Sequence, residues 1–217
     1  MSSSVNPSYV GVRDDLLAAI PAGRYARVLD VGCASGTTSA ELKRRYPEAR
    51  VTGIELDSLL AQAAEQRLDA VLQGDALMRL SELSQGGERF DLVLCGDVLE
   101  HLVDPWRALK ELRVLCSDGI VVVSLPNVAH WSTLATLFAG YWPYRERGIH
   151  DRTHLRFFAR NNLKEFFAGA GFEETSRRYH HRLLERPHWI NERLEPLLRW
   201  TPGLGRLTEY QFISVLR

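Results

Sequence analysis

The sequence has 217 residues, and its 27 Lys and Arg balance 27 Asp and Glu, so the formal net charge at neutral pH is zero. Hydrophobic residues make up 45% and charged residues 25%, which is typical of one globular domain with a full core and excludes a disordered chain. The charge balance argues against nucleic acid as a partner. No apolar run approaches the roughly 20 residues that a membrane span requires.

Short apolar segments alternate with helical patterns along the chain. The periodicity predicts an amphipathic first helix over residues 9–20, and apolar runs predict strands at 28–31, 51–55, 70–73, 90–95 and 120–125. Two later helices have clear starts, one capped by Asp104 with Pro105 and one capped by Asn161. We expect a buried stripe of Trp106, Leu109, Leu112 and Leu115 on the first of these. The last two strands are predicted at 172–179 and 210–216, which completes an α/β pattern.

The first predicted strand runs into the glycine-rich turn Gly32-Cys33-Ala34-Ser35-Gly36. The next helix is expected to open at Thr38, with Glu41 completing a capping box. Small residues at a strand-to-helix turn let a ligand lie against bare backbone near the helix N-terminus. The turn therefore predicts a nucleotide-type site.

Polar or small residues close each of the next strands, where open α/β sheets place their ligands. Glu55 ends the second strand and suits the two hydroxyls of a ribose. Gly74-Asp75-Ala76 follows the third strand, and Gly96-Asp97 follows the fourth. A dinucleotide-binding dehydrogenase is disfavoured, because its G-x-G-x-x-G fingerprint finds only its first glycine here.

Taken in order, VLDVGCASG, GIELD, GDA, FDLVLCGDVLEHL and SLPN resemble the motifs of class I methyltransferases that use S-adenosyl-L-methionine (SAM). The resemblance covers roughly residues 9–127. It implies a Rossmann-like sheet of seven strands, with helices on both faces and an antiparallel final edge. It also implies SAM as the methyl donor, bound by residues that we assign as follows: Asp30, Gly32, Cys33, Ala34 and Gly36 to the methionine part, Glu55 to the ribose, Asp75 and Ala76 to the adenine, and Gly96 beside them. Arg13, on the predicted first helix, is assigned to the carboxylate of SAM.

One position departs from that family's usual pattern. Ala34 replaces the middle glycine of the turn. An alanine fits there if its φ is negative, so we expect a negative φ and slightly tighter ligand packing.

The later stretch 148–172 resembles a bacterial branch of the same superfamily that is often found near glycan biosynthesis. Two segments lie outside the cofactor core, at about 128–160 and 181–207, and both are rich in aromatic residues and histidine. We interpret them as cap insertions on one domain spanning 1–217, where they wall a substrate pocket. The alternatives are a lid that packs its aromatics into the core, or the contact of a homodimer.

Proton removal from an acceptor hydroxyl suits a histidine, and His101 and His154 are the catalytic candidates, with His150 as a third. A second reading gives each of them a purely structural role. Asp97, Glu100 and His101 also resemble a cluster with which small-RNA 2′-O-methyltransferases hold a divalent cation, and His154 supplies a fourth ligand in that reading. Many relatives without a metal share Leu-Glu-His, so we assign no metal ligand.

The expected reaction is O-methylation of a hydroxyl, on a sugar or glycan precursor or another small molecule, with a quinone or phenol as the alternative. Methylation of base amino groups is disfavoured, because its motif is missing after the fourth strand. An alternative of a different class is a SAM-binding module that acts through a partner protein. Cys33, Cys95 and Cys116 are an odd number without metal-like spacing, and the first residues lack a signal-peptide pattern. We therefore expect buried thiols and a cytoplasmic protein.

Overall fold

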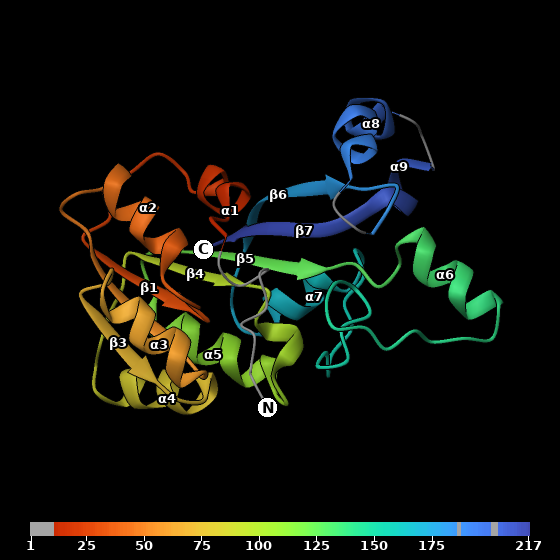
Figure 1. The fold of residues 1–217 in the computed structure, drawn as a ribbon. Helices are drawn as coiled ribbons and strands as arrows, with labels where there is room; N and C mark the ends of the chain where they lie inside the picture. The colour runs from red at the N-terminus through yellow and green to blue at the C-terminus, as the bar shows by residue number, and fades with distance from the viewer. Residues whose placement is uncertain (1–10, 186–187, 201–203) are drawn as a thin grey trace.

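The computed structural model describes residues 11–185, 188–200 and 204–217 (Figure 1). Its centre is a seven-stranded sheet in the order β3-β2-β1-β4-β5-β7-β6. The strands are β1 (Arg27–Val31), β2 (Arg50–Glu55), β3 (Ala70–Gln73), β4 (Leu92–Gly96), β5 (Ile120–Pro126), β6 (Glu174–His181) and β7 (Glu209–Leu216). The first five strands are parallel, and β7 pairs antiparallel with both β5 and β6. The predicted sheet with its antiparallel edge is confirmed.

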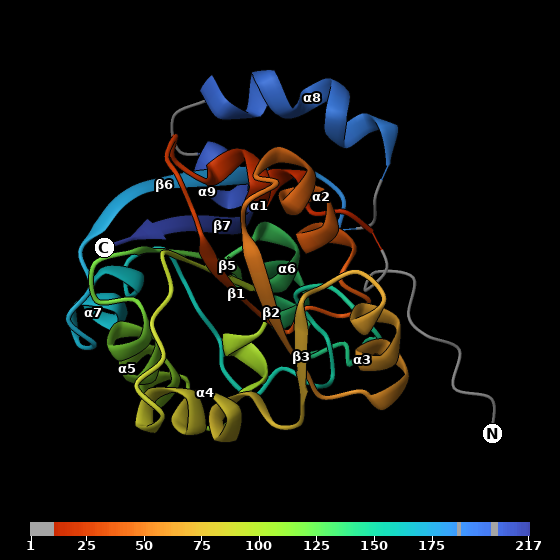
Figure 2. The same ribbon diagram turned by 90° about the vertical axis from the view of Figure 1, so that its left-hand side faces the viewer.

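Helices cover both faces of this sheet (Figure 2). In the described residues they are α1 (Asp14–Ala19), α2 (Thr37–Arg45), α3 (Ser58–Glu65), α4 (Ala76–Gln85), the 3₁₀ turn η2 (Leu99–His101), α5 (Pro105–Leu115), α6 (Trp131–Phe138), α7 (Leu163–Ala168), α8 (Trp189–Trp200) and α9 (Leu204–Thr208). Side chains of α1, α2 and α3 pack with one face of the strands, and those of α4, α5 and α7 pack with the other. Successive residues of β4 alternate between these two cores, as the period of a strand requires.

The first helix is shorter than the periodicity suggested. It begins after Arg13 and ends at Ala19, while positions 9 and 10 of the predicted helix lie outside the described residues. Leu16 and Leu17 are buried against the sheet as expected, but Val12 is 44% exposed.

α5 begins as predicted, since Asp104 accepts a hydrogen bond from Arg107 N at 3.0 Å and Pro105 is the first helical residue. Its three leucines, Leu109, Leu112 and Leu115, are fully buried. The prediction that Trp106 belongs to the buried stripe was wrong, because half of its surface is exposed. It lies at the end of the helix, where its ring meets Phe166 edge-on at 5.7 Å and Arg156 lies over it.

α7 begins one residue later than predicted. Its N-cap is Asn162 and not Asn161, and the Asn162 side chain accepts from Ala159 N at 3.0 Å outside the helix. Leu163, Phe166 and Phe167 are buried as the pattern indicated. The prediction was one residue too early because the Asn162 side chain closes the preceding loop and makes no hydrogen bond into the helix.

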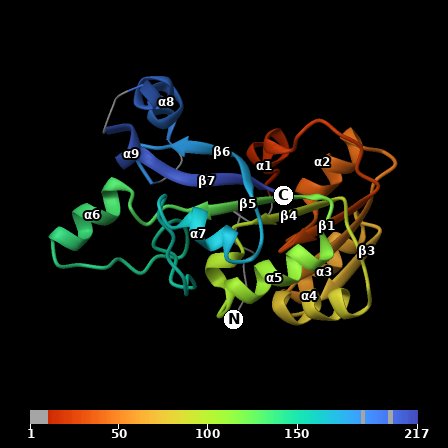
Figure 3. The ribbon, with the colours of Figure 1, turned by 180° about the vertical axis from the view of Figure 1, so that it is seen from behind.

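The segments predicted as cap insertions lie beyond the carboxyl end of β5. Figures 1 and 3 show α6, α8 and α9 at this end of the molecule, with α6 pointing away from the sheet. The three cysteines are free and buried, as expected. None of the described helices is both long and apolar enough to cross a membrane.

Candidate functional site

The turn between β1 and α2 contains three residues with positive φ: Gly32 at 70°, Ala34 at 49° and Gly36 at 76°. A Cβ on Gly32 would lie 2.5 Å from a methyl of Val98, so only bare backbone fits there. The negative φ expected at Ala34 was wrong. Hydrogen bonds on both sides set the path of the turn, since Ala34 N donates to the Glu55 carboxylate and Gly36 N donates to Cys33 O at 2.8 Å.

α2 begins directly after Gly36, without a side-chain cap. The predicted capping box is wrong, because the Thr38 hydroxyl accepts from Arg13 N at 3.1 Å and Glu41 pairs with Arg44. The two predicted capping residues are thus engaged elsewhere, and the N-terminus of α2 lies beside the glycine-rich turn. That arrangement favours a negatively charged or polar ligand group.

Glu55 closes β2, and its carboxylate reaches the turn. One oxygen accepts from Ala34 N at 2.8 Å and the other accepts from Asp57 N at 2.9 Å. Each carboxylate oxygen keeps a second lone pair, so both can still accept from hydroxyl groups. The residue predicted for the ribose therefore lies in contact with the turn predicted for the methionine part.

Asp30 is the buried acid of the site, only 6% exposed on β1. Burial raises the pKa of its carboxyl to about 7, and the charge of Glu55 adds to this, while the hydrogen bond from Ser39 Oγ at 2.6 Å opposes it. A nearby positive charge would favour the ionised carboxylate. The position suits a ligand that carries a cationic group.

Asp75 and Ala76 begin α4 immediately after β3. Asp75 caps the helix by accepting from Met78 N at 3.0 Å. Gly74 N donates to Glu55 O at 2.8 Å, which holds the ends of β2 and β3 together. The residues predicted for the adenine thus follow the strand beside Glu55.

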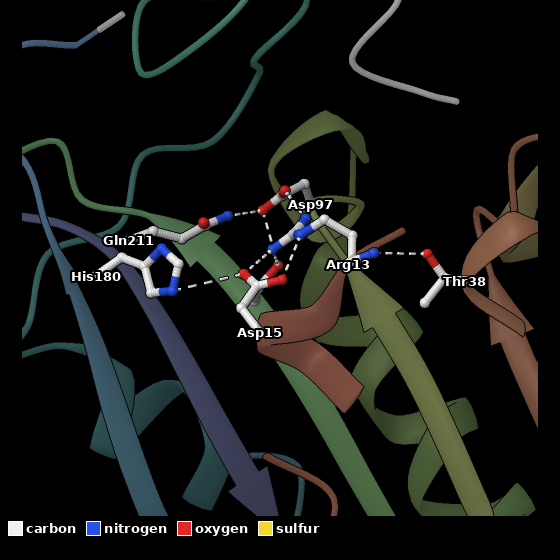
Figure 4. Close-up of polar contacts among 7 residues, drawn as sticks. Arg13, Asp15, Thr38, Asp97, His180 and Gln211 are labelled. Atoms are coloured by element: carbon white, nitrogen blue, oxygen red, sulfur yellow. Dashed lines mark hydrogen bonds and ion pairs between the residues drawn. The ribbon is translucent and has the colours of Figure 1, made fainter. Parts of the chain in front are cut away.

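A hydrogen-bonded network lies over the ends of β4 and β5 (Figure 4). The Arg13 guanidinium donates to both carboxylate oxygens of Asp15, each at 2.9 Å, and to Asp97. Asp97 also accepts from Ser124 Oγ at 2.8 Å and from the Gln211 amide. Six segments of the chain are joined here, since Thr38 and His180 also contact α1 (Figure 4).

Arg13 and Gly96 lie close together, because a Cβ on Gly96 would stand 3.8 Å from a guanidinium nitrogen. Burial acts to lower the pKa of Arg13, but Asp97 and Asp15 outweigh it and raise that pKa. Asp97 has a φ of 55°, a conformation that costs on the order of 1–3 kcal/mol and is concentrated at functional sites. The contact of Arg13 with a cofactor carboxylate stays a prediction.

The two catalytic candidates lie in contact. Leu155 N and Arg156 N donate to Glu100 O at 2.8 and 3.0 Å, which fastens the loop around His154 to η2. The rings of His101 and His154 then meet edge-on, with their centroids 4.7 Å apart. The sequence predicted both histidines, and the fold brings them together although they are far apart in the chain.

Glu100 completes this cluster. It is 1% exposed, and its Oε2 has no hydrogen-bond partner in the described part of the chain. Burial and the charge of Asp97 raise its pKa well above the usual range. Burial and the neighbouring His101 lower the pKa of His154.

One ligand atom from each of Glu100, His101 and His154 lies within 4.8 Å of the other two. Two imidazoles and a carboxylate form a donor set that suits divalent transition metals. The orphaned Glu100 oxygen fits such an ion. Asp97, the fourth residue considered from the sequence, is directed to Arg13 and Ser124 instead.

His150, the third candidate base, lies elsewhere. It is fully buried, and its Nδ1 is 3.2 Å from Glu185, which also pairs with Arg145. Burial alone would raise the pKa of Glu185, but His150, Ser132 and Arg145 lower it to about 2. His150 therefore joins the two predicted cap segments and is not part of the histidine cluster.

Sequence reasoning missed several polar residues of the site. Ser124 and Gln211 gave no signal, because a single polar residue in a strand is compatible with many roles. Asp151 and Thr153 were visible in the DRTH stretch. Their spacing is that of a side chain bonding to backbone two residues on, which could have marked them.

A family model described as a methyltransferase domain matches residues 9–176, more than half of the chain. Malonyl-[acyl-carrier protein] O-methyltransferase of Geobacter sulfurreducens is 32% identical over 152 residues, which cover 69% of this chain and 57% of that protein. Ubiquinone biosynthesis O-methyltransferase of Psychrobacter arcticus is 28% identical over 178 residues, covering 78% and 68%. The chain thus spans little more than half the length of the first of these relatives.

Solved structures show the same fold. The S-adenosylmethionine-dependent methyltransferase from Mesorhizobium loti superposes with a TM-score of 0.62 at 16% identity, covering 94% of this chain and 96% of that one. The strand order with its antiparallel edge, the bare turn after β1 and the acid ending β2 agree with the family match. The chain therefore belongs to the family of class I methyltransferase domains whose cofactor is SAM.

Proposed function

We propose that this protein transfers the methyl group of SAM to a hydroxyl oxygen, on a sugar or glycan precursor in the first place. A quinone or phenol is the alternative acceptor. The observation that carries the proposal is the contact between His101 and His154 beside buried Glu100, at the carboxyl edge of the sheet. SAM supplies an electrophilic methyl group on its sulfonium, and the chain must orient the acceptor and accept its proton.

The predicted cofactor residues divide the binding of SAM among them. The backbone at Gly32–Gly36 and the Asp30 carboxylate face the methionine part, with Arg13 as the partner of its carboxylate. Glu55 accepts from the ribose hydroxyls, and Asp75 with Ala76 contacts the adenine. Support comes from their placement at the ends of β1 to β4, where an open α/β sheet binds its ligands.

A hydroxyl is favoured over a carboxylate as the acceptor because of the two histidines. A carboxylic acid is already ionised at neutral pH and needs no base, whereas a hydroxyl must lose its proton as it attacks. His101 or His154 takes that proton. The relatives named above as O-methyltransferases are consistent with transfer to oxygen, which their names state for those proteins.

The cap segments at about 128–160 and 181–207 form the acceptor pocket in this proposal. They carry exposed aromatic side chains beyond the carboxyl end of β5, including Trp131, Tyr141 and Tyr144. Flat aromatic faces stack on sugar rings and on quinones alike. The resemblance of residues 148–172 to a glycan-associated branch favours the sugar.

A second form of the mechanism is favoured by the orphaned Glu100 oxygen. Glu100, His101 and His154 would hold a divalent cation in this form, and such an ion lowers the pKa of a bound hydroxyl. The histidines would then serve as ligands and not as the base. The two forms assign the same acceptor.

The test incubates the protein with methyl-labelled SAM and a bacterial cell extract, followed by mass spectrometry of labelled products. We expect a labelled methyl ether, which survives mild alkali. A product that loses its label in alkali is a methyl ester, and one labelled on nitrogen is an amine, and either would overturn the hydroxyl assignment. Activity that EDTA removes and Mg²⁺ or Mn²⁺ restores would favour the metal form over the histidine base.

A further inference from the structure

The DRTH stretch contains a short hydrogen-bond chain that none of the cofactor or base assignments uses. Asp151 Oδ1 accepts from Thr153 N at 2.8 Å and from the Thr153 hydroxyl at 2.6 Å. A hydroxyl has one hydrogen to donate, and an ionised carboxylate is its strongest available acceptor. The Thr153 oxygen can therefore only accept from any other neighbour.

That other neighbour is His101. Its Nδ1 lies 3.0 Å from Thr153 Oγ1 and 3.3 Å from the Thr153 carbonyl oxygen. The carbonyl cannot donate, and the hydroxyl has given its hydrogen to Asp151. In both contacts the Thr153 oxygen is therefore the acceptor, and the shared hydrogen is bonded to Nδ1 of His101.

We propose that Asp151 and Thr153 are positioning residues that fix His101 in the tautomer protonated on Nδ1. In a neutral imidazole one nitrogen is a donor and the other an acceptor, so Nε2 then carries the lone pair. His154 has the same arrangement, because its Nδ1 is 3.1 Å from Ile149 O. Both rings therefore present Nε2 as the nitrogen that can accept a proton or bind a cation.

The chain is also fixed in place relative to His101. The bonds from Leu155 N and Arg156 N to Glu100 O attach the residues after Thr153 to the turn that carries His101. His154 N donates to Asp151 O at 3.1 Å and closes the loop on itself. The assignment of a tautomer rests on these contacts alone, and only its catalytic consequence rests on the proposed function.

The experiment measures the ¹⁵N shifts of the His101 ring in metal-free protein with EDTA at pH 8.5, where an ordinary imidazole is neutral. A His101→Gln variant assigns the signals by their loss. We expect a protonated Nδ1 and an unprotonated Nε2. Asp151→Ala frees the Thr153 hydrogen to donate to Nδ1, so the ratio of the two tautomers should fall by about fivefold, the effect of one hydrogen bond.

Matched variants separate this effect from a disturbed loop. Asp151→Asn keeps an acceptor oxygen and Thr153→Ser keeps the hydroxyl, so both should retain the wild-type tautomer ratio, whereas Thr153→Val should lower it. With labelled SAM, Asp151→Ala should lower kcat and leave SAM affinity unchanged, and Asp151→Asn should restore kcat. A wild-type ring protonated on Nε2, or a ratio unchanged in a folded Asp151→Ala variant, would overturn the proposal, and neither result depends on activity or on the acceptor.

Discussion

At the scale of single residues, two residues other than glycine have a left-handed backbone conformation in the described part of the chain. Both lie at the site. Ala34 has a φ of 49° in the glycine-rich turn and Asp97 has a φ of 55° at the end of β4. A Cβ in this region crowds the following carbonyl, at a cost of about 1–2 kcal/mol. Strain of this kind persists only where neighbouring contacts impose it.

Ala34→Gly should therefore raise the free energy of unfolding by about 1 kcal/mol, since glycine adopts this φ without the steric cost. Urea denaturation of both proteins measures the difference. The Glu55 hydrogen bond to the backbone at position 34 is retained in the variant, so the turn itself should not change. A loss of stability would mean that the alanine methyl contributes packing that outweighs the strain.

Glu55→Ala should weaken SAM binding by about 1–3 kcal/mol, the range for losing a charged hydrogen-bond partner. The variant removes the proposed acceptor for the ribose hydroxyls and also the bond that holds Ala34 N. Calorimetric titration with SAM measures the change. Asp57→Ala is a suitable control, because it removes the cap of α3 on the same loop without removing the carboxylate of Glu55; equal losses in the two variants would argue against a role in ribose binding.

At the scale of elements, the two cap segments are joined by specific polar contacts. His130 Nε2 lies 2.8 Å from Arg182 O, and Trp131 Nε1 donates to Leu183 O at 2.8 Å. Glu185 adds its pairs with Arg145 and His150. Segments on either side of β6 in the sequence are therefore expected to move as one unit.

Glu185→Ala should loosen the contact between the segments, because it leaves buried His150 without its charged neighbour. We expect a loss of about 1–3 kcal/mol in stability and faster hydrogen exchange across residues 141–150 and 181–185. Glu146→Ala is the matched control, since Glu146 pairs with Arg152 in solvent, where such a pair contributes little. Similar exchange in both variants would show that the segments are held by packing and not by this pair.

Elements could be predicted from the sequence wherever the signal was local. The residues at 70–73 form a strand with the predicted bounds, because its apolar run is bounded by turn residues. The starts of α2 and α7 could not be predicted in this way. The Thr38 hydroxyl accepts a hydrogen bond from Arg13 N, and the Asn162 side chain accepts one from Ala159 N. A capping side chain that finds a partner across the fold gives no sign of it in the local pattern.

At the scale of the whole molecule, the candidate site also has a part that the sequence predicts and a part that depends on distant contacts. The residues at the strand ends could be predicted, because a parallel sheet brings its carboxyl ends to one edge. The contact between His101 and His154 depends on how residues 151–156 attach to Glu100. His150 lies among the cap residues instead, because it pairs with Glu185. Those distant contacts decided which histidines meet.

The buried carboxyl of Asp30 makes the stability of the whole molecule depend on pH. Its pKa is near 3.8 in an exposed chain and about 7 in the fold, so the folded protein holds this proton more tightly. Its contribution is fully present below about pH 4 and is lost as the pH rises through 7. Asp30→Asn should remove that part of the slope when free energies of unfolding are compared between pH 4 and 8, and an unchanged slope would contradict the shift.

In the proposed reaction, His101 or His154 accepts the proton of the acceptor hydroxyl as the methyl group leaves SAM. The most direct measurement is the release of S-adenosylhomocysteine from SAM in a bacterial cell extract, with the wild-type protein and with His101→Ala and His154→Ala variants shown by calorimetry to bind SAM. We predict release by the wild type and a rate lower by about 10²–10⁴ in at least one variant, the usual effect of removing a general base. Tight SAM binding with no release from any extract, or wild-type rates in both variants, would contradict catalysis by these histidines.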